Sequence, residues 1–108
     1  MPDSAIVEGP AVIPREFSLE QNYPNPFNPT TEFRYALPYP SNVRLTIYNV
    51  LGQPIRILVD GNQNAGYQSA EWNAGSYASG TYFYRLDAVS VDDPSKHFMQ
   101  VRRMVLVK

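Results

Sequence analysis

The chain has no cysteine, only one histidine and no long apolar run, and each absence excludes a class of protein. Without cysteine, neither a disulfide framework nor a thiolate metal site can form. No segment approaches the roughly 18–20 apolar residues of a transmembrane helix, and the start Met1-Pro2-Asp3 is unlike a charged signal peptide. Nine basic and ten acidic residues nearly cancel, so no net field attracts nucleic acid or an anionic membrane.

Candidate catalytic and metal-binding residues are scarce. A nucleophilic triad would have to use His97, which lies in a predicted strand, and no glycine-rich phosphate loop is present. Asp92 and Asp93 precede a proline in a predicted turn and lack the alternating oxygen ligands of a calcium loop. The sequence therefore predicts neither an enzyme nor a cofactor.

The chain divides into a linker and one folded domain. Residues 1–16 contain three prolines, one glycine and no lasting periodicity, which is typical of a linker. Residues 17–108 have the size of a single domain. If the protein is exported, its signal peptide belongs to a longer parent of which this chain is a piece. The alternative is a small cytosolic protein that begins at its natural Met1.

The folded part shows the period-two alternation of short β-strands. The alternating apolar residues are Phe33, Tyr35 and Leu37; Val43, Leu45 and Ile47; Ile55, Ile57 and Val59; and Tyr82, Tyr84 and Leu86. A short strand over 69–72 and a last strand over 97–107 complete the set, and Asp60-Gly61 is expected to open a turn. About seven such strands predict an all-β, immunoglobulin-like antiparallel β-sandwich.

Three of the ten prolines, at positions 24, 26 and 29, fall within six residues. No helix or central strand runs through such a segment, so we expect a stiff crossing over one end of the sandwich. Asn22, Asn25 and Asn28 are expected to satisfy neighbouring backbone groups. Gly52 and Gly80 are expected where a Cβ is unwelcome.

The last strand is a local cationic strip, because Lys96 is followed by two arginines and Lys108 with no acid between them. A basic strand ending at Lys108 could be an address read by a receptor, since chain ends are accessible. The alternative is that its charges only discourage edge-to-edge aggregation. Met104 and Leu106 are expected to pack inward, although Val105 and Val107 are equally plausible core residues.

The aromatic residues permit a second hypothesis. Four fall in phase with aliphatic neighbours and are expected in the core: Trp72, Tyr35, Tyr82 and Tyr84. Tyr39, Tyr67 and Tyr77 lie next to turn residues and could form a sugar-stacking surface. A carbohydrate-binding or adhesive immunoglobulin-like module is therefore the alternative function.

Four ordered blocks carry a family resemblance: FSLEQNYPNPFNPTT at 17–31, VRLTIYNVLGQ at 43–53, SGTYFYRL at 79–86 and RMVLVK at 103–108. In these blocks the chain resembles the type A C-terminal sorting domain of the type IX secretion system of Bacteroidetes-type bacteria, over about residues 17–108. Family members often carry lysines ahead of the final Met-Val-Leu, where this chain has Arg102 and Arg103. Positive charge is kept, although arginine and lysine are not equivalent donors.

The resemblance implies a function. A passenger domain ahead of the linker would reach the periplasm and then cross the outer membrane to the cell surface or the medium. The implied partners are that passenger, the outer-membrane translocon and shuttle components of the type IX system, and a sortase-like cysteine protease. The protease would cut within 1–16 and attach the passenger to anionic lipopolysaccharide or release it.

The resemblance also implies which residues matter. The secretion machinery would recognise the terminal residues Arg102, Arg103, Met104, Val105, Leu106, Val107 and Lys108. The family motif, with a structural role, comprises Asn22, Pro24, Asn25, Pro26, Phe27, Asn28, Pro29, Gly52 and Gly80. No metal, cofactor or nucleic acid is implied.

Overall fold

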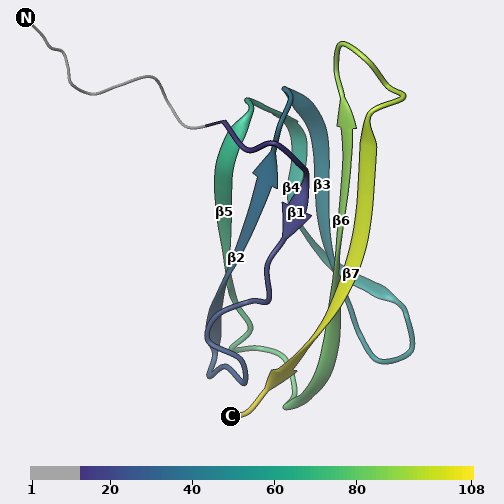
Figure 1. The fold of residues 1–108 in the computed structure, drawn as a ribbon. Helices are drawn as coiled ribbons and strands as arrows, with labels where there is room; N and C mark the ends of the chain where they lie inside the picture. Colours follow the sequence, from purple (N-terminus) through teal and green to yellow (C-terminus); the bar gives the residue numbers. More distant parts are fainter. Residues whose placement is uncertain (1–12) are drawn as a thin grey trace, which may run out of the picture.

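Two antiparallel sheets face each other in the computed structural model, which describes residues 13–108 (Figure 1). The strands are β1 (Ser18–Leu19), β2 (Thr30–Leu37), β3 (Ser41–Tyr48), β4 (Pro54–Gln63), β5 (Gly66–Asn73), β6 (Gly80–Ser90) and β7 (His97–Leu106). One sheet has the order β1-β2-β5 and the other has the order β4-β3-β6-β7. The predicted all-β, seven-strand sandwich is confirmed.

The core lies between the sheets and follows from the alternation of the strands. In β2, β3 and β6 every second side chain points inward. The alternating apolar residues predicted for β2 therefore pack against those of β3 and β6 in the opposite sheet. All four aromatic residues expected in the core are buried there. Phe33 of β2 and Tyr84 of β6 meet across the sandwich with ring centroids 4.7 Å apart.

The strand β4 differs from its prediction. Asp60-Gly61 does not open a turn, because Gly61 continues β4 and pairs with Val43. Leu45 pairs with Val59 and Thr46 with Ile57, so one extra residue bulges out of β4. A bulge of this kind changes the face of the sheet to which the following side chains point. Ile57 is therefore 50% exposed and does not lie in the core.

The predicted crossing connects β1 to β2 at one end of the sandwich. The peptide bonds that precede Pro24, Pro26 and Pro29 are cis. Elsewhere, Gly52 and Gly80 have φ of 81° and 150°, and no atom lies within 4 Å of a Cβ built on either. Glycine is therefore favoured at these two positions by backbone conformation and not by lack of space.

The predicted linker 1–16 is described only in part, because residues 1–12 lie outside the described residues. Residues 13–16 form no strand and lead directly to β1.

Candidate recognition surface

The C-terminal half of β7 has one buried and one exposed face. Met104 and Leu106 are fully buried against the core. Arg103 and Val107 are exposed, as expected where successive side chains of a strand point to opposite faces. Met104 and Leu106, and not Val105 and Val107, are therefore the core residues of this strand.

The two adjacent arginines do different things. The Nε of Arg102 donates a hydrogen bond to the carbonyl oxygen of Leu19 at 2.7 Å, which ties β7 to β1. Arg103 lies on the outer face with its side chain in solvent. The pair consequently does not form one cationic patch, and Arg103 carries the exposed charge.

Lys108 is bound to the fold. Its Nζ donates hydrogen bonds to the carbonyl oxygens of Gly75 at 2.7 Å and Tyr77 at 3.0 Å. Its backbone N–H donates to the hydroxyl of Ser79 at 3.0 Å. The loop between β5 and β6 thus holds the last residue, so its ammonium group is a cap for backbone carbonyls as well as a surface charge.

The proline-rich segment lies against the edge of β7, beside the C-terminal end of the chain (Figure 1). The N–H of Phe27 donates to the carbonyl of Val105, and the N–H of Val107 donates to the carbonyl of Phe27, both at 2.9 Å. The N–H of Val105 donates to Oδ1 of Asn25 at 2.9 Å, and Nε2 of Gln21 donates to the Arg103 carbonyl at 2.8 Å. Residues 21–27 and 103–107, called the junction below, therefore form one unit.

Two buried side chains fix the first half of the junction. Asn22 donates through Nδ2 to the Pro24 carbonyl at 3.2 Å and to the Thr31 hydroxyl at 3.0 Å. The Tyr84 hydroxyl accepts the N–H of Asn22 at 2.8 Å and donates to the Glu20 carbonyl at 2.7 Å. Burial, only partly offset by the Asn22 hydrogen bond, raises the pKa of Tyr84 to about 12. The phenol therefore stays neutral and keeps donating through ordinary pH.

The asparagine prediction holds for one of the three residues. Asn22 bonds a neighbouring backbone group as expected, and Asn25 bonds a backbone group of the last strand instead. The exposed side chain of Asn28 makes no hydrogen bond to another described residue. The sequence did not indicate that Gln21, Asn25 and Phe27 meet the last strand. One signal was available, because Phe27 is the only aliphatic or aromatic residue between Tyr23 and Phe33, and such a residue needs a core to enter.

Catalytic and metal-binding groups do not gather elsewhere in the described part of the chain. His97 is exposed at the start of β7. Oδ1 of Asp93 accepts hydrogen bonds from the hydroxyl and the N–H of Ser95, which lower the pKa of Asp93. No group of three or more His, Cys, Asp or Glu residues within 13–108 is placed to hold a metal ion. Over the same residues, no helix has the length and apolarity needed to cross a membrane.

The three tyrosines of the alternative function do not form a stacking surface. Tyr67 is 66% exposed. Tyr77 packs against Trp72 with ring centroids 5.4 Å apart, and Tyr39 packs edge-on against Phe17 at 6.0 Å. Two of the three rings are thus engaged in packing, and the carbohydrate-binding alternative is not supported.

Comparison with known families gives one match. A family model described as a secretion system C-terminal sorting domain matches residues 21–99. The match includes the family-motif residues from Asn22 to Pro29, together with Gly52 and Gly80, and ends before Arg102. No curated protein and no solved structure matches the chain.

Proposed function

Because this chain belongs to the family of secretion system C-terminal sorting domains, we propose that the junction displays the part of the domain that the type IX machinery reads. The domain itself is a type IX C-terminal sorting signal, which implies an N-terminal passenger and export to the cell surface or the medium. The matched family is not a known enzyme family, and we assign the domain no catalytic role.

The observation that supports this proposal is the anchoring of the last strand. Four hydrogen bonds of the junction, the Arg102 contact to Leu19 and the Lys108 contacts hold residues 102–108 in one conformation. A receptor that binds a fixed surface does not have to pay the entropy of ordering a flexible tail. The outward side chains Arg103 and Val107 would then be contacts for the shuttle or translocon.

We propose the remaining steps because of the family match. The passenger precedes residue 17 of a parent protein and passes through the periplasm. A sortase-like cysteine protease cuts within 1–16, where extended chain suits a protease, and attaches the passenger to lipopolysaccharide or releases it. The linker 1–16 and the domain 17–108 are the two units of this scheme.

The test is a secreted fusion in a bacterium that has a type IX system. Residues 1–108 are placed behind a periplasmic signal peptide and a reporter, and the reporter is measured in periplasm, on cells and in medium. We expect export of the fusion, and its complete retention in the periplasm would refute the sorting function for this chain.

A matched pair of charge reversals tests the role of the outer face. Arg103 contacts the rest of the domain through its backbone, and Arg56 is an exposed arginine on β4, at the far edge of the same sheet. We expect Arg103→Glu to reduce export severalfold and Arg56→Glu to leave it unchanged, with equal melting temperatures. Equal export of the two variants would remove Arg103 from the recognised surface while leaving the sorting function intact.

A further inference from the structure

The four-stranded sheet has two edges, and they are built differently. The edge strand β4 begins at Pro54, contains two register shifts and carries the charged residues Arg56 and Asp60. Proline, bulges and charges are the devices by which proteins keep an edge strand from pairing with another chain. β7, at the other edge, pairs with β6 in one unbroken register from His97 to Leu106.

The junction protects only the C-terminal half of the β7 edge. Val105 directs its N–H to Asn25 and its carbonyl to Phe27, so both groups point away from β6. In an antiparallel pair this direction repeats at every second residue. The N–H and carbonyl groups of Met99 and Val101 therefore point to the same edge, where they make no hydrogen bond to another described residue.

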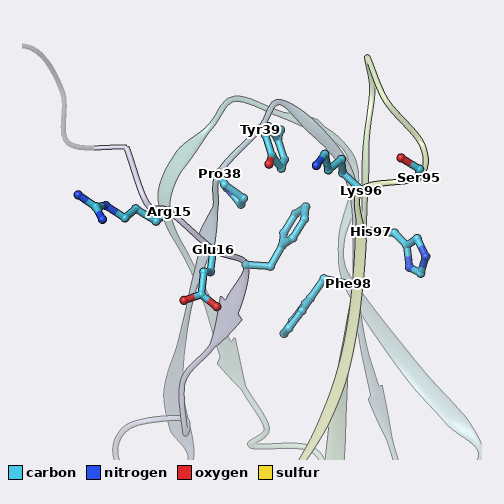
Figure 2. Close-up of a pocket in the computed structure, with 9 residues that line it drawn as sticks. Arg15, Glu16, Pro38, Tyr39, Ser95, Lys96, His97 and Phe98 are labelled. Carbon is cyan, nitrogen blue, oxygen red and sulfur yellow. The ribbon is translucent and has the colours of Figure 1, made fainter.

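Most side chains of this open stretch are apolar. Met99 is 56% and Val101 is 48% exposed on the outer face of the sheet. On the inner side, Phe98 stacks on Phe17 with centroids 5.7 Å apart, and the two rings line a surface groove with Tyr39 and Lys96 (Figure 2). Residues 97–101 thus combine unpaired backbone groups, two exposed apolar side chains and an adjacent groove, which are the three parts of a strand-addition site.

We propose that residues 97–101 of β7 bind an extended segment of a partner protein as an added strand, with a short apolar centre flanked by acidic side chains. Positive charges at both ends of the stretch favour a partner with acidic side chains on either side of its apolar centre. Lys96 and Arg103 bracket it and are exposed, and β7 itself contains no acid. The nearby acids are Asp87, which lies opposite Met99 and is paired with Arg85, and Glu16 at the groove. In the preceding hairpin turn, Asp93 is hydrogen-bonded to Ser95.

The same charges argue against a second copy of this chain as the occupant. Antiparallel pairing of two such stretches about Gln100 would bring Arg103 of each copy beside Lys96 of the other, at both ends of the pair. Like charges held close together across a strand pair destabilise it. The site lies next to the junction and shares only the flanking Arg103 with it, and its occupation does not depend on the export function.

The test is amide hydrogen exchange and chemical-shift mapping by NMR on the full 108-residue chain. The probe is a capped peptide, EVTVTVE, which has an apolar centre and acidic ends. In the free protein we expect fast exchange at Met99 and Val101, and slow exchange at Phe98 and Gln100, whose N–H groups bond to β6. The peptide should slow exchange and shift the signals at Met99 and Val101, and no effect at millimolar peptide would overturn the proposal.

If another segment occupied the edge at residues 97–101, the results would differ and would also overturn the proposal. Slow exchange at Met99 and Val101 in the free monomer would mean that residues 1–12 of the same chain occupy the edge. Protection that grows with protein concentration, together with a dimer in sedimentation, would mean that a second copy does.

Two variants and a second peptide complete the test. Val101→Pro removes one outward-pointing N–H without removing a bond to β6, so binding of the peptide should weaken roughly tenfold. Val101→Thr keeps that N–H and should bind about as well as the parent. KVTVTVK should bind the unchanged protein at least about tenfold more weakly than EVTVTVE, because its ends repel Lys96 and Arg103. Equal binding by the two peptides, or by a folded Val101→Pro variant and its parent, would refute the proposal.

Discussion

Replacing Phe27 by alanine should reveal how strongly the junction contributes to the stability of the domain. The ring is 1% exposed and packs against Trp72 with centroids 5.8 Å apart. Truncating a buried phenylalanine costs about 3–5 kcal/mol. Phe27 lies at the end of the sandwich, where neighbours can partly close the gap, so we expect the lower value, about 3 kcal/mol. Domains of this size have only about 5–15 kcal/mol of stability in total.

The assay combines urea and thermal unfolding with amide hydrogen exchange. A loss of about 3 kcal/mol should lower the melting temperature by roughly 12 °C or more, taking about 4 °C per kcal/mol. The exchange of Val105 and Val107 should accelerate more than that of Leu86, because the N–H of Val107 bonds the Phe27 carbonyl. Local loss at the junction is thereby separated from global destabilisation.

The matched control is Tyr23→Ala in the same segment. The Tyr23 side chain is 80% exposed, so its loss should change the free energy of unfolding by less than about 0.5 kcal/mol. If Phe27→Ala cost less than about 1 kcal/mol, or no more than Tyr23→Ala, the reasoning that Phe27 anchors the end of the sandwich would be wrong.

Two further predictions concern polar groups of the junction and its support. Asn25→Ala should lower the free energy of unfolding in urea by about 0.5–1.5 kcal/mol and speed exchange at the Val105 amide, because it removes the acceptor of that N–H. Asn28→Ala removes no hydrogen bond to a described residue, so it should change neither quantity. Equal losses of stability in the two variants would contradict the role of Asn25. The pKa of Tyr84 is raised to about 12 from 10.0, so its neutral form is favoured by folding. The resulting stability is complete below pH 10 and lost as pH rises to about 12, by roughly 2–3 kcal/mol at most. Unfolding curves between pH 9 and 12 should show a shallower loss for Tyr84→Phe than for the parent, and parallel losses would refute the link.

The fold was predictable because period-two patterning acts locally. In β2, Phe33 and Tyr35 are separated by Arg34, and in β6, Tyr84 and Leu86 are separated by Arg85. A strand with this pattern buries the same face wherever it pairs. The strand β4 was predicted, but the exposure of Ile57 was not, because a bulge adds one residue to one strand only. The bulge arises from the pairing of β4 with β3, and the spacing of Ile55, Ile57 and Val59 does not indicate that pairing.

The junction was harder to predict for a different reason. The sequence identified residues 22–29 and 102–108 as separate features, one structural and one recognised. Their contact joins residues about eighty positions apart through backbone groups of Phe27, Val105 and Val107. Every residue except proline carries both of these groups, so a backbone contact cannot be predicted from the type of residue that makes it. Gln21 and Asn25 are the residues whose side chains hydrogen-bond across the junction, and polar residues in a loop have many possible partners.

The bond between Phe27 and Val107 also sets an order of events during synthesis. Domains begin to fold as they emerge from the ribosome, at about 5–20 residues per second. The proline-rich segment is made about eighty residues before its partners Val105 and Val107. The edge of β7 and the burial of Phe27 are therefore completed only after residue 107 has left the exit tunnel. An interrupted chain would keep Phe27 unburied, which marks it as unfinished to any chaperone that binds exposed apolar groups.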